Sequence, residues 1–319
     1  MEPGPVASRP ARVLGFEKAC PCSSSKKHLG FPWPKGARQV NKEILIRDIP
    51  QTVLDDVILL LKNYLVAVYI VLPEKQQLRP RPIGSGTFVE IEGTHYILTA
   101  AHVWHKAKEA KNIGLVLTDH QSSFMVLRDG ISAKEVWGGK IQEWGPDIAL
   151  LNLAPSDVVT IKARKSFLNL SQQKEALSKC PPLIEKGLWA VTGMVGEFTE
   201  VQPNPEARIV ACHIHGEAFI STVQQTHEHN GYDYFDLGAN LELPGSPSSF
   251  AGVSGGGLWQ VKLSMAKSGT ISWDEKLYFR GVAFWESEKT DGHRMIRCHG
   301  PKSIFEKAWD SWALPSRMK

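Results

Sequence analysis

Hydrophobic residues along the chain follow two different spacings. Residues 50–64 place apolar side chains at helical intervals, with Thr52 as the expected N-cap, and so predict a short helix. The other apolar runs in the first half are short, rich in β-branched and aromatic residues and bounded by turn residues, which is typical of antiparallel strands. These runs are 65–72, 86–93, 94–101, 113–120, 122–130 and 147–154.

The second half of the chain repeats this organisation after a polar interval. Residues 155–181 are rich in Ser, Lys and Gln, and we interpret them as the connection between two β units. Segment 301–314 has apolar residues at helical spacing and predicts a C-terminal helix. The strand-like runs between these two segments are 187–196, 207–216, 217–225, 232–238, 255–264 and 276–285.

This pattern predicts an all-β fold of two antiparallel units with a short N-terminal helix and a C-terminal helix. Residues 1–45 form an arm rich in Pro, Gly, Ser and Lys without sustained periodicity, which favours a loosely structured extension. We expect the first β unit over 46–165 and the second, with the terminal helix, over 166–319.

Composition and charge narrow the classes of function. The 319 residues include 37 basic and 33 acidic side chains, a net charge of only +4, so no nucleic-acid or membrane partner is expected. Five scattered cysteines indicate reduced thiols in a cytoplasmic protein rather than a paired disulfide framework. The first residues lack the apolar core of a secretory signal, and the apolar stretch 53–73 is interrupted by Asp, Lys and Asn.

Three short motifs carry candidate chemistry. "TAAH" ends a strand-like run and presents His102, "DIALL" opens another with Asp147, and "GVSGGG" places Ser254 in a glycine-rich turn. Taken singly, such a histidine is usually structural, such an aspartate a cap and such a glycine run a plain turn. Together they supply what a serine nucleophile needs, a neighbouring base and a carboxylate that orients that base.

These three motifs resemble the catalytic motifs of the chymotrypsin/trypsin-like serine peptidases, and the likeness extends over roughly residues 60–315. The resemblance implies two six-stranded antiparallel β-barrels with the site in the cleft between them. It also implies His102 as general base and then acid, Asp147 as its orienting partner and Ser254 as the acylated nucleophile. The backbone N–H groups of Gly252 and Ser254 would form the oxyanion hole.

The same resemblance extends to substrate binding. "RGVAFWES" is similar to the strand that lines the primary pocket of these peptidases, which would place Phe284, Trp285 and Glu286 along the groove for a protein or peptide substrate. "SSFAG" would form the base and wall of the pocket. Ser248 in that segment implies an uncharged floor and a preference for apolar or neutral side chains.

Two departures from the family pattern change the expectation. Val253 stands where secreted members carry an aspartate that pairs with a newly cut N-terminus, and no cysteine flanks His102 or Ser254. We therefore expect an intracellular, bacterial, disulfide-free relative that is not switched on by N-terminal cleavage. Its oxyanion hole must be ordered in another way, and control by a regulatory protein partner or by a narrow substrate range is a reasonable hypothesis.

Two other functions remain as alternatives. The first is a catalytically silent trypsin-like fold that binds peptides or proteins in its cleft, although such a module has no need of all three catalytic groups. The second is an interaction protein in which the arm carries the function and the β units serve as scaffold.

The arm contains a candidate metal motif. "ACPCSSSKKHLG" resembles the first half of the SEC-C zinc motif and offers Cys20, Cys22 and His28. Zinc takes four ligands in structural sites, and no second pair follows within a dozen residues. Cys298 and His299 could complete the set only through a long-range contact, so a degenerate remnant is favoured.

Two histidine pairs offer a second candidate. His213 with His215, and His227 with His229, each lie on one face of a strand-like run, and the two pairs could bind a metal if they faced each other across a hairpin. Solvent-facing polar strands are the favoured interpretation. We therefore expect no metal and no cofactor.

Overall fold

The computed structural model describes residues 44, 46–74, 77–110, 113–117, 125–127, 131–202, 211–213, 216–242 and 245–313. Apart from Ile44, the predicted arm lies outside these ranges, and so do Cys20, Cys22 and His28.

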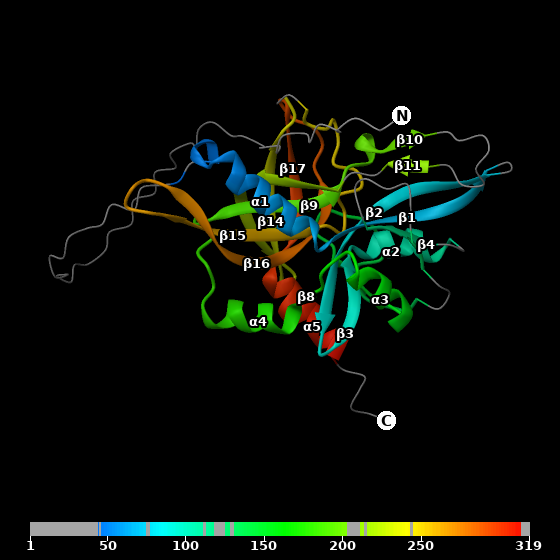
Figure 1. Ribbon diagram of the computed structural model, residues 1–319. Coiled ribbons are helices and arrows are strands. Elements are labelled where there is room, and N and C mark those ends of the chain that lie inside the picture. Colours follow the sequence, from blue (N-terminus) through cyan, green and yellow to red (C-terminus); the bar gives the residue numbers. More distant parts are fainter. Residues whose placement is uncertain are drawn as a thin grey trace.

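Two large antiparallel sheets dominate the described chain (Figure 1). The first has the strand order β5-β4-β1-β2-β3-β7-β6, and β8 adds to β2 in parallel. Its strands are β1 Leu65–Glu74, β2 Gln77–Ile91, β3 Thr94–Thr99, β4 Ile113–Val116, β5 Met125–Val126, β6 Ala133–Trp137, β7 Asp147–Asn152 and β8 Leu168–Asn169.

The second sheet has the order β12-β9-β15-β16-β17-β14-β13. A separate ladder joins β10 Glu200–Gln202 to β11 Ala211–His213. The strands of the second sheet are β9 Leu188–Met194, β12 Gly216–Ser221, β13 Val223–His229, β14 Tyr232–Asn240, β15 Gly257–Met265, β16 Ile271–Glu286 and β17 His293–His299.

The fold is thus mostly β, in two antiparallel sheets, as the sequence predicts. The sheets contain eight and seven strands rather than six each, and among the described strands no pairing closes either sheet into a barrel. Helices connect and flank the sheets: α1 Gln51–Lys62, α2 Ala101–Lys108, α3 Pro155–Lys162, α4 Leu170–Lys179, α5 Trp309–Ala313, with the 3-10 turns η1 Ile46–Asp48 and η2 Gly196–Phe198 and the π-helical segment η3 Ser303–Ala308.

The predicted first helix is present as α1, which buries Leu54, Val57 and Leu61 on one face. Its first turn differs from the prediction. Pro50 occupies the N-cap position without a side-chain cap, so the assignment of Thr52 as the cap is wrong. A proline fixes the backbone angle φ that the helix entry needs, and no hydroxyl is required there.

The predicted connection over 155–181 contains the helices α3 and α4. Between them, β8 still pairs with β2 of the first sheet, a few residues beyond the predicted start of the second unit at residue 166. The predicted C-terminal helix is also present, as η3 followed by α5.

One of several hydrophobic clusters lies between the two sheets. This cluster contains Val89 and Ile148 from the first sheet together with Ala190, Trp259 and Phe279 from the second. Burial of this much apolar surface holds the sheets against each other.

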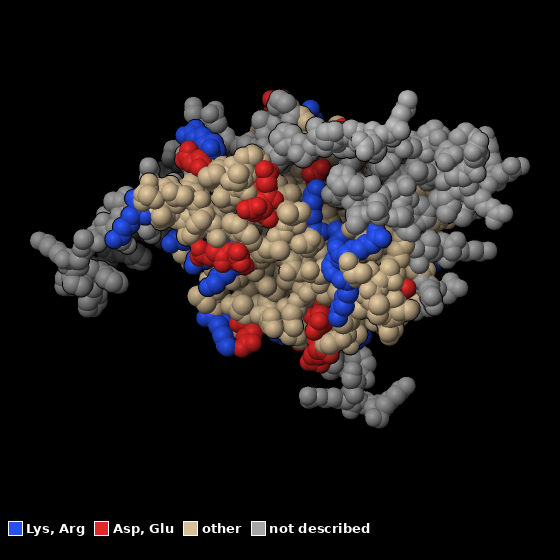
Figure 2. All heavy atoms as spheres, in the orientation of Figure 1, with Lys and Arg blue, Asp and Glu red and all other residues tan. Residues whose placement is uncertain are grey.

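No helix in the described ranges is long and apolar enough to cross a membrane. On the face seen in Figure 2, acidic and basic side chains are interspersed and do not form a broad surface of one sign.

The free cysteines Cys180 and Cys298 differ in burial, and we expect them to differ in reactivity. Cys180 is exposed after α4, whereas Cys298 is fully buried in β17. Burial raises the pKa of the Cys298 thiol, with a further increase from Asp236, so little reactive thiolate forms.

Iodoacetamide should therefore modify Cys180 in the native protein and spare Cys298, as read by peptide mass mapping. In denaturant both should react. Equal modification of the two in the native state would contradict the buried placement.

Candidate active site

His102 and Asp147 make a two-point contact across adjacent elements of the first unit. The His102 backbone N–H donates to Asp147 Oδ1 at 2.9 Å, and His102 Nδ1 lies 2.6 Å from Asp147 Oδ2. Both side chains are buried, with exposed fractions of 7% and 2%. The carboxylate therefore holds the proton on Nδ1 and leaves Nε2 as the basic nitrogen of the ring.

The local sequence explains this placement. β3 ends at Thr99, and the small residues Ala100 and Ala101 follow, both fully buried. Ala100 is the N-cap of α2, so His102 lies in the first turn of that helix. Asp147 is the first residue of β7, which pairs with β3. A strand end and a neighbouring strand start thus bring the two side chains together.

Ser254 lies in a tight turn that precedes β15. Val253 N–H donates to Phe250 O at 2.9 Å, and Gly256 N–H donates to Val253 O at 2.8 Å. Gly252 has φ +99° and Gly255 has φ +90°. These left-handed conformations strain any residue that carries a Cβ, which explains the glycines on both sides of the serine.

Two backbone N–H groups of the turn belong to peptides whose carbonyls are held by hydrogen bonds. Ala251 O accepts from Gly196 N–H at 2.8 Å, and Val253 O accepts from Gly256 N–H. In a trans peptide the C=O and N–H point in opposite directions, so the N–H groups of Gly252 and Ser254 point away from those contacts. Among the described residues neither has an acceptor, and both are available to an anion, as the predicted oxyanion hole requires.

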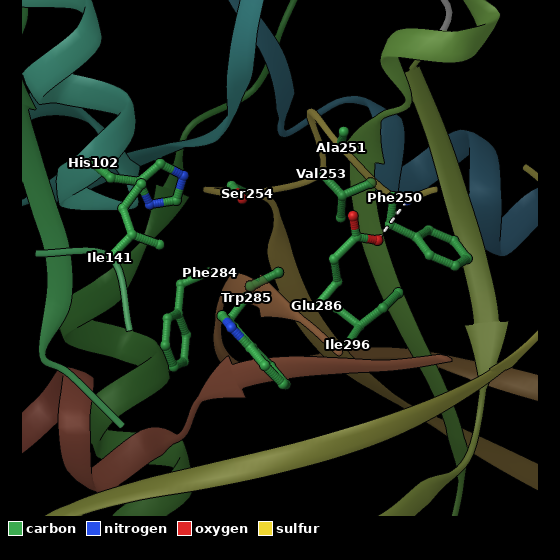
Figure 3. Close-up of a pocket in the computed structure, with 11 residues that line it drawn as sticks. His102, Ile141, Phe250, Ala251, Val253, Ser254, Phe284, Trp285, Glu286 and Ile296 are labelled. Carbon is green, nitrogen blue, oxygen red and sulfur yellow. Dashed lines mark hydrogen bonds between the residues drawn. The ribbon is translucent and has the colours of Figure 1, made fainter. Parts of the chain in front are cut away.

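His102 and Ser254 face one cavity of about 180 Å³ (Figure 3). The His102 ring points toward Ser254 across this space. No hydrogen bond joins the two side chains in this structure, as is frequent in active sites without substrate. The three predicted catalytic residues are thus brought to one place, although they come from two sheets.

Phe284, Trp285 and Glu286, the predicted groove residues, also line this cavity, whereas Ser248 does not. Ser248 is exposed, and both its N–H and its hydroxyl donate to Glu197.

The wall of the cavity includes a carboxylate, that of Glu286, which the sequence predicts to lie along the groove. Glu286 accepts from the Ser249 hydroxyl and from Phe250 N–H, each at 2.7 Å. The Glu286 carboxylate also lies 3.6 Å from Arg294. The expectation of an uncharged pocket floor rested on Ser248, which does not line this cavity, and it stays a prediction.

His299 is a further residue of the site that sequence reasoning missed. Its Nε2 accepts the backbone N–H of Asp147 at 3.1 Å, and its ring stacks on Phe284 at 4.2 Å between centroids. It is fully buried, and this burial lowers its pKa to about 3, with a smaller opposing effect from Asp147. A neutral imidazole thus supports the backbone of the predicted catalytic aspartate.

The loop between β6 and β7, residues 138–146, leads into Asp147 and is attached to the second sheet by Arg297. Arg297 binds Asp236 through two nitrogens, each at 2.7 Å, and Glu143 at 2.8 Å. Its guanidinium lies 3.8 Å from the ring centroid of Trp144. Tyr234 adds a hydrogen bond to Trp144 O at 3.0 Å. These contacts fix the approach to β7 from the opposite sheet.

The described strands do not form the disfavoured metal alternative for the two histidine pairs. β13 pairs with β14 while β11 pairs with β10, so the strands of the two pairs are not neighbours in a hairpin. His227 instead contacts Asp236 at 3.0 Å, and His215 lies outside the described residues. Within the described ranges no group of three or more His, Cys, Asp or Glu is arranged to hold a metal ion.

Cys298 and His299 are consecutive residues of β17, so their side chains project from opposite faces of the sheet. They are therefore not placed to act together as a ligand pair, and Cys20 and Cys22 lie outside the described residues.

Comparison with known proteins assigns the chain to no family. No family model and no curated protein matches the chain. Among solved structures, the chain is similar to one from work on the coupled folding and binding of the intrinsically disordered VPg protein of Sesbania mosaic virus. The sequences are 16% identical, the TM-score is 0.38, and the match covers 77% of this chain and 88% of that chain.

Proposed function

We propose that the chain is a chymotrypsin-like serine endopeptidase that hydrolyses peptide bonds through an acyl-enzyme. One observation carries the proposal: Asp147 binds His102 at two points, and the free edge of that imidazole faces Ser254 across a shared cavity. The proposal includes the view that the two sheets correspond to the two barrels of that family.

The proposed reaction has two halves, acylation of Ser254 and hydrolysis of the acyl-enzyme, and each catalytic group acts in both. Ser254 Oγ attacks the substrate carbonyl carbon while His102 Nε2 takes the hydroxyl proton, and Asp147 stabilises the imidazolium. The N–H groups of Gly252 and Ser254 bind the negative oxygen of the tetrahedral intermediate. His102 then gives its proton to the leaving amine. Water, activated by the same imidazole, hydrolyses the acyl-enzyme and restores the Ser254 hydroxyl.

The backbone of the turn is essential to this chemistry. Removing one oxyanion donor from such a site lowers kcat by about 100- to 1000-fold. The two unpaired N–H groups beside Ser254 therefore support the proposal as strongly as the hydroxyl does.

Labelling with a fluorophosphonate probe tests the proposal. The wild-type protein should acquire one probe on Ser254, and both Ser254→Ala and His102→Ala should lose labelling. Ser264→Ala is the matched control, because this serine lies in β15, after the turn of Ser254, and its hydroxyl contacts Ser272 and Asp274 rather than the cavity. Absence of labelling in folded wild-type protein would count against a serine peptidase and in favour of a silent binding module.

A further inference from the structure

Ser85 is a fully buried serine in β2 of the first sheet that lies against the turn of Ser254. Its hydroxyl donates to Gly252 O at 2.6 Å and accepts from Met194 N–H at 2.7 Å. Its own N–H donates to Ser254 O at 2.7 Å. Ser85 therefore binds the turn at two carbonyls, one on each side of Val253.

The turn is pressed closely onto this serine. A Cβ added to Gly255 would lie 2.0 Å from Ser85 O and 2.1 Å from Thr99 Oγ1. Thr99 Oγ1 in turn donates to Ser85 O at 2.6 Å, so the carbonyl of Ser85 is fixed as well. Every polar group of Ser85 has a partner, and three of these contacts reach residues of the second unit.

Val253, between the two bound carbonyls, supplies no polar contact through its side chain. It is buried among apolar residues that include Val191, Val195 and Phe250. With the carbonyls of Ala251 and Val253 bound by Gly196 and Gly256, Ser85 supplies the bonds that hold Gly252 O and Ser254 O. Four consecutive carbonyls are thereby fixed, and the N–H groups of Gly252 and Ser254 stay in one orientation.

We infer that Ser85 is the positioning residue that orders the oxyanion hole, through hydrogen bonds from the first sheet to the nucleophile turn. This inference rests on the proposed peptidase function. It explains how the hole is kept in shape although Val253 forms no ion pair. The arrangement forms as the two sheets pack together.

Removing the hydroxyl leaves Gly252 O and Met194 N–H without their partner in a buried place. The Gly252–Val253 peptide is then free to rotate, and this turns the two neighbouring peptides and misaligns the Gly252 and Ser254 N–H groups that the transition state needs. Substrate binding in the apolar part of the cavity does not depend on those donors. The effect therefore belongs to kcat rather than to KM.

The test compares Ser85→Ala with Thr87→Val in the full chain, using a chromogenic peptide ester and a peptide boronic acid. Thr87 is the matched control, because its hydroxyl is also buried in β2, on the same face, but has no hydrogen-bond partner in the described structure. We expect Ser85→Ala to lower kcat by about 10- to 100-fold with KM changed less than about twofold. Affinity for the boronic acid, which mimics the tetrahedral intermediate, should fall by a similar factor. Thr87→Val should stay within about twofold of wild type for each quantity.

Ser85→Cys keeps the shape and offers only a weak S–H donor, so it should show an intermediate loss and allows the measurement if the alanine variant does not fold. Active-site titration with the fluorophosphonate corrects every rate for the folded fraction. Equal kcat in Ser85→Ala and Thr87→Val, or a loss that appears only in KM, would overturn the role of Ser85. Failure of the wild-type protein to label at Ser254 would instead overturn the proposed function.

Discussion

Replacing Asp147 with asparagine is expected to lower kcat by about four orders of magnitude while the protein stays folded. Both carboxylate oxygens accept from His102, one from its backbone N–H and one from Nδ1. An amide has a single acceptor oxygen. When this oxygen accepts from the His102 backbone N–H, the amide NH₂ group faces His102 Nδ1. The ring proton then moves to Nε2, so Nε2 can no longer take the proton of the Ser254 hydroxyl.

The measurement is steady-state hydrolysis of a chromogenic peptide ester, with the unfolding transition recorded in parallel. Asp157→Asn serves as the control, because Asp157 is also buried but lies in α3, away from the cavity. A kcat of Asp147→Asn within tenfold of wild type would refute the proposed role of the carboxylate.

The second large effect concerns His299 and acid. As pH falls below the ordinary pKa of a histidine, we expect the free energy of unfolding to decrease by about 1.4 kcal/mol for each pH unit because of His299. Burial holds the pKa of His299 at about 3 in the folded chain, against 6.5 for an ordinary histidine. Between about pH 3 and pH 6.5, His299 is therefore protonated in the unfolded chain but stays neutral in the folded chain. The stability is therefore fully present above pH 6.5 and is lost as pH falls toward 3, by about 5 kcal/mol in all.

Urea unfolding of wild type and His299→Gln at several values between pH 4 and pH 7 measures this effect. A neutral glutamine offers Oε1 to the Asp147 N–H but does not titrate, so the variant should be less stable at neutral pH and less sensitive to acid. The two free energies should approach each other as pH falls. His105→Gln controls for the general removal of a histidine. Parallel pH profiles of wild type and His299→Gln would contradict a buried neutral His299.

Strong local patterns made part of the fold predictable from the sequence. The helical spacing of Leu54, Val57 and Leu61 predicted α1, and β3 and β7 were predicted by short apolar runs that end or begin at the candidate catalytic residues. The glycines around Ser254 predicted the tight turn, because positive φ leaves few other residues acceptable. These signals lie within a few positions of the feature that they predict.

The strand β17 could not be predicted in this way. Its sequence HRMIRCH is polar and resembles a surface segment, yet it pairs with β14 and β16 inside the second sheet. Arg297 is buried there with Asp236 as its partner, and His299 Nε2 accepts from the Asp147 N–H, at separations of 61 and 152 residues. A local pattern does not contain such partners. The roles of His299 and Ser85 therefore became visible only with the structure, as did the distance of Ser248 from the cavity.

The bonds from Ser85 and His299 both cross from one sheet to the other, and this has a consequence for how the protein would fail. Each sheet can remain folded while a small slip between the two separates Ser85 from Gly252 and His299 from Asp147. A shift of this kind abolishes the catalytic geometry without unfolding either sheet. Loss of activity in mild heat or dilute urea should thus precede unfolding. Activity should return as soon as the two sheets regain their native packing.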